Sequence, residues 1–428
     1  MIKVLASSWA LLLGMMLLQV GNGLQGTLLG VRGQLEGFST FSMSIVMSGY
    51  FVGFLFGSRM APEMIRRVGH VRVFAALGSL ISAVLILYPV ATHPIAWMAG
   101  RIVIGFCFSG VYVTAESWLN NAATNETRGQ SLSLYMIVQM AGIVSAQAIM
   151  VLADPSGFIL FIVSSVLVSI AFAPILLSIS PTPAFGTTKP MSLLEIMRIS
   201  PLGCVGMFLL GGVFSAQFGM APVFGAEAGL SVGQISAFVS TFFIGALVLQ
   251  YPVGWMSDRM DRRVLILGTA VLGGLGALLG FALSGYFVML LVAGLTIGGV
   301  SNPLYALLIA YTNDFLDFDD MAAASGGMVF INGLGAVTGP LVTGWVMGQI
   351  GPRGFFLFIA VLLLAMAGYA AYRMTQRAAP SVEDTDSYAP VALGATPMAV
   401  EFAQEYAIET AQEEAAQEEE AAATAASG

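Results

Sequence analysis

Two charged side chains, Arg101 and Glu116, interrupt one apolar stretch of the chain. On a helix their separation corresponds to roughly 22 Å, so the two charges cannot pair with each other. Each needs its own partner, because a bare charge among apolar residues costs several kcal/mol. We interpret Arg101 as a cation that attracts an anionic or polar ligand; the alternative is a side chain that extends to the membrane surface. Glu116 is interpreted either as a carboxylate that exchanges a proton or as the acidic half of a gating ion pair, whose basic half would be Arg66, Arg67 or Arg72.

Neutral polar residues in other apolar stretches form a second group of candidates. Asn22 and Gln25 are three residues apart and therefore share one face of a helix. Asn302 and Tyr305 share a face in the same way, on either side of Pro303. Any one of them could serve only as a hydrogen-bonding contact between helices. Together they could line a polar binding site.

The composition identifies the surroundings of these residues. The chain has 428 residues, of which 57% are hydrophobic and only 9% are charged, whereas a soluble domain carries roughly 25% charged residues. This predicts a polytopic membrane protein and excludes nucleic-acid binding and a secreted disulfide scaffold. The 50 glycines favour closely packed transmembrane helices. Cys107 and Cys204 lie in apolar runs and are interpreted as small core residues.

The sequence predicts neither an enzyme nor a cofactor site. His70 and His93 fall in expected loops on opposite sides of the membrane, so neither an intramembrane Ser/His pair nor a His/Cys metal cluster is predicted. The sequence also lacks a phosphate-binding loop followed by lysine, so ATP-driven transport is not supported.

Apolar runs of about 20 residues, the length that crosses a bilayer, alternate with short loops. Twelve such runs predict an all-α polytopic membrane protein. The expected spans are approximately 5–31, 40–60, 72–91, 95–117, 130–152, 157–179, 202–225, 233–255, 264–283, 286–310, 323–348 and 354–374.

Basic residues are distributed unevenly over the expected loops. If the N-terminus is cytoplasmic, thirteen bases fall in inside loops and two, Arg32 and Arg353, fall in outside loops. This positive-inside bias predicts that both termini face the cytoplasm. We expect a multi-pass protein of a bacterial-type inner (plasma) membrane.

Residues 378–428 differ from the rest of the chain. They hold eleven of the 24 acidic residues and none of the 16 basic ones, so residues 1–377 carry 13 acids against 16 bases. Glutamates without lysine partners one turn away do little to stabilise an isolated helix. We expect an acidic, disordered cytoplasmic tail; the alternative is a docking segment for a cytoplasmic partner.

A weak internal repeat divides the membrane body. Three pairs of matching stretches share offsets of 192 to 194 residues, and Gly142 with Gly335 is one of them. This offset is close to half the length of the body, which favours a duplicated unit. The predicted divisions are a six-helix half at 1–180, a cytoplasmic linker at 181–200, a six-helix half at 201–377 and the tail at 378–428.

The loop after the eighth predicted span carries the most specific motif. Its residues, Gly254-Trp255-Met256-Ser257-Asp258-Arg259-Met260-Asp261-Arg262-Arg263, resemble the signature loop of the major facilitator superfamily (MFS). The first-half copy is degenerate, with Arg66 where the family usually has Asp. Within the superfamily the chain is most similar to the YcaD-like group, through Glu116-Ser117, Arg128-Gly129, Pro303-Leu304-Tyr305 and Thr312-Asn313-Asp314.

This resemblance implies an MFS fold of two pseudo-symmetric halves around a cavity, lined mainly by the first, fourth, seventh and tenth spans. The expected cavity residues are Asn22, Gln25, Arg101, Tyr112, Gln217, Asn302 and Tyr305. Weaker candidates from the fifth and eleventh spans are Tyr135, Gln139 and Asn332. Aromatic residues are interpreted as lipid-facing bulk, including Phe208, Phe214, Phe218 and Phe224.

The resemblance also implies a gate on the cytoplasmic side. Asp258 is interpreted as a latch that accepts backbone N–H groups at the start of a neighbouring helix and holds that side closed. The alternative is a loop that only anchors at anionic headgroups. The expected gating or coupling residues are Glu116, Arg66, Arg67, Arg72, Asp258, Arg259, Arg262 and Arg263.

The implied function is secondary active transport of a small polar or anionic solute by alternating access. Proton coupling is one alternative for its energy source. The expected partners are a small-molecule substrate, the lipid bilayer and, under that alternative, protons; a monomer is expected. A second hypothesis, suggested by the acidic tail, is a transporter-like sensor or assembly factor that binds a ligand without moving it.

Overall fold

The computed structural model of the protein describes residues 2–124, 127–177, 191–376, 388, 389, 391 and 394–407. In these residues all regular structure is helical, which confirms the predicted all-α class. The helices are α1 (Ile2–Leu35), α2 (Thr40–Val68), α3 (His70–Leu87), α4 (Pro94–Ala122), α5 (Arg128–Met150), α6 (Ile159–Leu177), α7 (Leu193–Ile199), α8 (Pro201–Ser215), the π-helix η2 (Ala216–Met220), α9 (Ala221–Glu227), α10 (Val232–Ser257), α11 (Arg262–Ala282), α12 (Phe287–Asn313), α13 (Phe318–Ile350) and α14 (Gly354–Gln376). Residues 397–407 form a further helical stretch.

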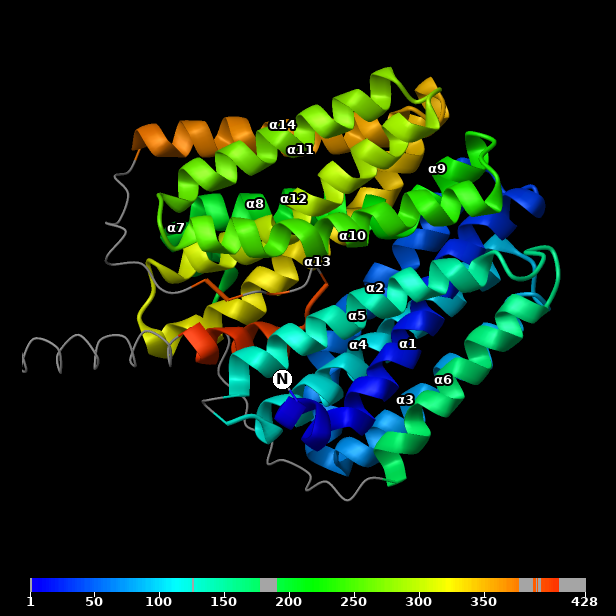
Figure 1. The fold of residues 1–428 in the computed structure, drawn as a ribbon, viewed down its shortest axis with the longest axis horizontal. Helices are drawn as coiled ribbons and strands as arrows, with labels where there is room; N and C mark the ends of the chain where they lie inside the picture. Colours follow the sequence, from blue (N-terminus) through cyan, green and yellow to red (C-terminus); the bar gives the residue numbers. More distant parts are fainter. Residues whose placement is uncertain are drawn as a thin grey trace, which may run out of the picture.

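The helices form two bodies that lie side by side (Figure 1). Helices α1–α6 make up the first half, with α2 packed on α4 and α1 on α5 and α6. Helices α8–α14 make up the second half, with α10 packed on α12 and α8 on α13. Part of the linker predicted at 181–200 lies outside the described residues, and its described end contains α7.

The predicted spans correspond to the observed helices. Eleven described helices are long and apolar enough to cross a membrane, and α6 contributes a shorter apolar helix at Ile159–Pro174. The structure differs at the predicted loop around residue 70, because α2 continues to Val68 and α3 begins at His70. His70 is buried there, with its Nε2 atom 3.1 Å from the Ser117 hydroxyl. The prediction that His70 lies in a loop is therefore wrong; its contact with Ser117 joins α3 to α4.

The two halves are joined directly at one end of the helices. There the Ser48 hydroxyl donates to the Val337 carbonyl oxygen at 2.6 Å, and the Thr40 hydroxyl bonds to the Glu227 carboxylate. The opposite end carries the arginines of the α2–α3 and α10–α11 junctions, and we call it the basic end. In Figure 1, residues 394–407 (red) lie between the two halves at the basic end.

The predicted span 202–225 is not one regular helix. It is divided into α8, the π-helical turn η2 and α9. Pro222 lies at the start of α9, and a proline has no N–H with which to continue the hydrogen bonding of the preceding turn. Wide π-turns of this kind are frequent at functional sites. The turn carries Gln217 and Phe218.

Glycines allow the closest helix crossings of both halves. A Cβ atom on Gly105 of α4 would lie 1.9 Å from a carbonyl oxygen of α2. A Cβ atom on Gly298 of α12 would lie 2.1 Å from a carbonyl oxygen of α10. The two glycines stand 193 residues apart in the sequence. Backbones can approach this closely only where no side chain intervenes.

Replacing Gly105 by alanine should therefore destabilise the protein, because α2 and α4 would have to separate. We expect a loss of about 1–3 kcal/mol, measured as a lower Tm of the purified protein in detergent, and a similar loss for Gly298→Ala. Gly268→Ala is the matched control, since Gly268 lies within α11 and an added Cβ would meet no atom within 4 Å. Equal Tm values for Gly105→Ala and Gly268→Ala would contradict this account.

Candidate functional site

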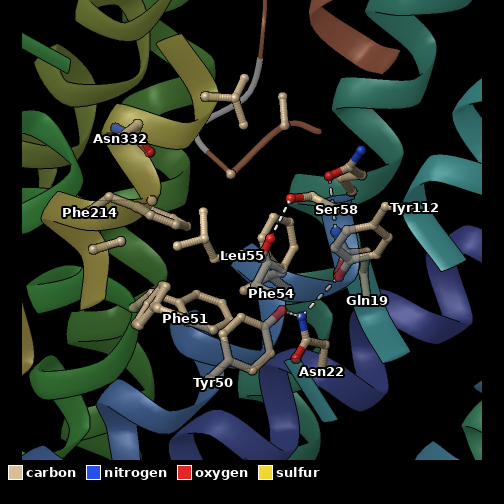
Figure 2. Close-up of a pocket in the computed structure, with 18 of the residues that line it drawn as sticks. Gln19, Asn22, Tyr50, Phe51, Phe54, Leu55, Ser58, Tyr112, Phe214 and Asn332 are labelled. Atoms are coloured by element: carbon tan, nitrogen blue, oxygen red, sulfur yellow. Dashed lines mark hydrogen bonds between the residues drawn. The ribbon is translucent and has the colours of Figure 1, made fainter. Parts of the chain in front are cut away.

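A cavity with about 750 Å³ of empty space lies between the two halves (Figure 2). Helices α1, α2, α4 and α5 line it from the first half, and α8, η2, α10 and α13 line it from the second. A second chamber of about 480 Å³ adjoins it. The two chambers share five wall residues, which are Gln139, Ile143, Phe214, Phe218 and Phe243.

A chain of hydrogen bonds covers the first-half wall of the cavity. The Tyr112 hydroxyl donates to Gln19 Oε1 at 2.7 Å, and Gln19 Nε2 donates to Gln139 Oε1 at 3.0 Å. Asn22 Nδ2 donates to the hydroxyls of Tyr112 and Tyr50, at 2.9 Å and 3.2 Å. Figure 2 shows Gln19, Asn22, Tyr50 and Tyr112 gathered on one side of the cavity. Amides and phenols arranged in this way can donate to and accept from a polar solute.

The second-half wall also carries amides. Gln217 and Asn302 line the second chamber. Gln217 Nε2 donates to the Ser301 hydroxyl at 2.8 Å, and Asn302 Nδ2 donates to Gln250 Oε1 at 2.8 Å. Asn332, a weaker candidate, lines the first chamber. Both halves thus contribute polar groups to one continuous site.

The structure places four of the seven predicted cavity residues on the walls, and these are Asn22, Tyr112, Gln217 and Asn302. Gln25 lies behind Asn22 and donates to its Oδ1 at 3.2 Å. Tyr305 is fully buried, and its hydroxyl has no hydrogen-bond partner among the described residues. Neither Gln25 nor Tyr305 is part of the cavity lining.

Arg101, the remaining predicted cavity residue, is fully buried in α4. Its guanidinium carbon is 4.6 Å from the centre of the Tyr50 ring, and Tyr50 itself lines the cavity. The three guanidinium nitrogens have no hydrogen-bond partner in the part of the chain that the structure describes. The aromatic ring offsets part of the cost of burying this cation. A side chain that extended to the membrane surface would expose its guanidinium, whereas the Arg101 side chain is completely buried.

Glu116 is buried on the same helix, nearer the basic end. Its carboxylate accepts hydrogen bonds from the Tyr135 hydroxyl at 3.0 Å and from the Thr396 hydroxyl. Glu116, Tyr135 and Gln139 together line a small pocket, and Gln139 also lines the larger cavity. Polar residues therefore continue from the cavity wall at Tyr50, next to Arg101, as far as Glu116.

Two arginines proposed as gating partners of Glu116 form ion pairs with another residue instead. Arg66 and Arg67 each pair with Glu63 at 2.6 Å, at the exposed end of α2. Arg72 is exposed in the first turn of α3. An arginine and a glutamate one turn apart on a helix meet without any tertiary contact, so these pairs form locally.

The signature loop makes three separate contacts at the basic end. Arg262 forms a buried ion pair with Asp314, which caps the end of α12. Arg263 pairs with Asp261 at 2.8 Å. Arg259 is exposed and lies over the Trp255 ring, 4.4 Å from its centre. Asp314 thus supplies a partner for a signature arginine.

Asp258 contacts the tail. Its Oδ1 atom accepts the backbone N–H of Tyr388 at 2.9 Å. Burial raises the pKa of the Asp258 carboxyl above its ordinary value, against the opposing effects of the Tyr388 N–H group and of Arg262 and Arg259. In the observed structure this carboxylate holds a backbone N–H group of the tail.

The aromatic wall of the cavity corrects one sequence-based interpretation. Phe214 and Phe218, expected to face lipid, line both chambers. Phe51 lies 5.8 Å from Phe214 and 6.3 Å from Phe218, measured between ring centres. Phe224 is buried among other aromatic rings, whereas Phe208 is 42% exposed. The cavity therefore has one hydrogen-bonding side and one aromatic side.

Several lining residues were missed by sequence reasoning. Gln19 stands three residues before Asn22, so the row Gln19, Asn22 and Gln25 at helical spacing was a signal that could have identified it. Tyr50 carries no such signal, because its role depends on the partners that tertiary packing brings to it. Gly394 and Ala395 belong to the tail and were expected to lie away from the helices.

Comparison with known proteins identifies the family. A model described as Major Facilitator Superfamily matches residues 11–232 and 203–395. The chain belongs to the major facilitator superfamily. It is therefore a multi-pass secondary transporter rather than an enzyme, as the sequence predicted.

Two relatives support the more specific resemblance. The chain is 24% identical over 358 residues to the uncharacterized MFS-type transporter YcaD of Escherichia fergusonii, covering 82% of this chain and 91% of that protein. It is 23% identical over 359 residues to the uncharacterized MFS-type transporter YE1530 of Yersinia enterocolitica, covering 83% of this chain and 92% of that protein.

Solved structures confirm the fold. The nucleoside transporter NupG superposes with a TM-score of 0.66 at 15% identity, covering 86% of this chain and all (100%) of that one. A bacterial homologue of the human lysosomal transporter Spinster superposes with a TM-score of 0.63 at 13% identity, covering 93% of this chain and 97% of that one.

Asp314→Asn should strongly destabilise the MFS fold, because it removes the negative charge from a buried ion pair with Arg262. The two side chains are each 2% exposed, and loss of one partner of such a pair costs about 3–5 kcal/mol. Asp261→Asn is the control, since Asp261 is 29% exposed in its pair with Arg263. Tm values in detergent give the comparison, and a smaller loss for Asp314→Asn than for Asp261→Asn would refute the assignment.

Proposed function

We propose that this transporter carries a small polar solute by alternating access and binds it in the cavity between the two halves. The observation that carries the proposal is the two-sided lining: a hydrogen-bonded wall of amides and phenols faces a wall of phenylalanines. In the part of the chain that the structure describes, the walls of both chambers consist of uncharged residues. This chemistry favours a neutral solute with hydroxyl, amide or ring-nitrogen groups and one apolar face.

Within this proposal the wall groups exchange partners when solute binds. The Tyr112 hydroxyl is hydrogen-bonded to Gln19 at 2.7 Å and to Asn22 at 2.9 Å, so it links the two amides. A solute hydroxyl that replaces one of these bonds costs little, because each amide keeps both donor and acceptor capacity. The Phe214 and Phe218 rings would cover the apolar face of the solute.

The distribution of basic residues supports an orientation of the protein in the membrane. We propose that the basic end faces the cytoplasm, since the loops expected from the sequence on that side hold thirteen basic residues against two on the other. The cross-half hydrogen bonds at Ser48 and Thr40 close the other end. The structure would then represent a state closed toward the outside.

Proton coupling through Glu116 is the second part of the proposal. The carboxylate accepts from Tyr135, and both residues share a small pocket with Gln139 of the cavity wall. A proton taken up by Glu116 would change what Tyr135 can donate, and the change would reach Gln19 through Gln139. Solute binding and protonation would in this way act on the same set of hydrogen bonds.

An anionic solute is the alternative substrate class. It requires that Arg101 move out from behind Tyr50, because the guanidinium is fully buried in the observed arrangement. Arg101→Lys tests this alternative, since lysine keeps the charge but loses the planar group that grips a carboxylate.

Removing the Tyr112 hydroxyl should weaken solute binding with little effect on folding. We would screen purified protein by thermal shift against neutral sugars, nucleosides, amino acids and organic acids, and measure affinity for the best ligand. Tyr112→Phe should lower that affinity about three- to tenfold, which corresponds to one hydrogen bond. Tyr286→Phe is the control, because Tyr286 is 69% exposed and outside the cavity. Equal affinities of the two variants would reject the proposed site.

Replacing Glu116 by glutamine should separate accumulation from exchange. In vesicles with an imposed proton gradient, Glu116→Gln should abolish accumulation of the ligand found above but retain exchange across the membrane. Glu63→Gln is the control, since Glu63 is an exposed carboxylate that pairs within its own helix. Normal accumulation by Glu116→Gln would exclude proton coupling at this carboxylate, and flux by either variant distinguishes a transporter from a sensor.

A further inference from the structure

The tail enters the protein instead of extending from it. Residues 388, 389, 391 and 394–407 are described, and residues 397–407 form a helix between the two halves at the basic end (Figure 1). The expectation of a disordered tail is wrong for these residues; residues 408–428 lie outside the described part of the chain. Gly394 and Ala395 reach far enough to line the proposed solute cavity.

The first half holds this segment through α4 and α5. The Thr396 hydroxyl donates to the Glu116 carboxylate. Glu405 pairs with Arg128 at 2.5 Å, and the Arg128 guanidinium also lies 5.7 Å from the centre of the Phe402 ring. These contacts engage the residue that the proposed coupling depends on and the arginine at the start of α5.

The second half holds the segment through α10, α12 and α13. The Tyr388 hydroxyl accepts from Gln250 Nε2 at 2.7 Å, and Gln250 in turn accepts from the cavity residue Asn302. Gln404 Nε2 donates to Asn313 Oδ1 at 3.1 Å, and the Ser325 hydroxyl donates to Gln404 Oε1 at 2.5 Å. The segment therefore bonds to both halves at once.

Burial explains why this segment is ordered. The side chains most deeply buried are those of Thr396, Val400, Phe402 and Ala403, each no more than 2% exposed. An isolated helix of this length is marginal in water, so its helical form depends on the surfaces of the two halves. A sequence rich in Ala, Glu and Gln supplies small and polar side chains that suit a crevice of mixed polarity.

We propose that residues 388, 389, 391 and 394–407 belong to a built-in plug that blocks the basic end of the cavity. Solute can pass this end only after the segment has left the space between the halves. The inference rests on the proposed function in one respect, that the cavity is the path of the solute. Because the plug bonds to both halves, it also holds them apart at the basic end, and alternation requires its release.

The test measures access to the cavity and needs no solute. Ser58 lines the cavity and is 9% exposed, so Ser58→Cys introduces a thiol there. The rate of reaction with N-ethylmaleimide is read at position 58 by peptide mass spectrometry, in the purified full chain with both buried native cysteines kept. A chain that ends at residue 387 should react at least tenfold faster than the full chain. A chain that ends at residue 407 is the matched control and should react at the full-chain rate.

A second variant keeps the test decisive if the shorter chain does not fold. Glu405→Arg places two like charges together at Arg128 and should accelerate labelling in the otherwise full chain. Adding Arg128→Glu restores an opposite-charge pair and should slow the reaction again. Ser156→Cys, in an exposed loop at the other end, should react at one rate in every background.

Equal rates at position 58 in the full chain, in any folded chain ending at residue 387 and in Glu405→Arg would overturn the plug. So would faster labelling of the chain ending at residue 407, since that chain keeps every residue assigned to the plug. Failure of the solute-binding prediction would leave these rates unchanged, so the two proposals can fail separately.

Discussion

Polar groups inside a bilayer must find their hydrogen-bond partners within the protein, because the surrounding lipid offers none. The internal structure of this transporter depends on that constraint. Amides and phenols of α1, α2, α4 and α5 bond one another along the cavity wall, from Tyr50 to Gln139. At the basic end the same requirement joins Arg262 to Asp314. Arg101 departs from it, with three buried nitrogens that lack a partner among the described residues. A residue that costs stability in this way is more readily explained by function than by folding.

Much of the fold could be predicted because the bilayer limits what a chain can do. Helix positions follow from the length of apolar runs, and the family follows from a loop motif whose residues are contiguous. The repeated glycines mark close contacts between helices. Gly142 packs against the backbone of α1, and Gly335, its repeat partner, packs against the backbone of α8. These features are local in the sequence or recur at one offset, so they can be recognised without knowing any tertiary contact.

The site could be predicted only in part, because a binding wall is defined by pairs of residues and not by single ones. Asn22 and Tyr112 were recognisable as polar residues in apolar helices, but their bond to each other joins positions 90 residues apart. Phe214 and Phe218 have no composition or spacing that separates a cavity-facing ring from a lipid-facing one. The tail was misjudged for a related reason. Its helix is too short to be stable alone, and its partners Arg128, Asn313 and Glu116 lie on three different helices.

The plug and the latch proposed for Asp258 make opposite demands on one carboxylate. As a latch, Asp258 would cap the start of a neighbouring helix when the basic end closes; in the observed structure it accepts the backbone N–H of Tyr388. The backbone of the plug also fills the space through which the two halves would have to approach each other. Approach of the two halves at the basic end and occupancy by the plug are then mutually exclusive, and Asp258 is released to act as a latch only when Tyr388 leaves. The tail would in this way stabilise the state in which the halves stand apart at the basic end, and it would block the passage in that state until it is displaced.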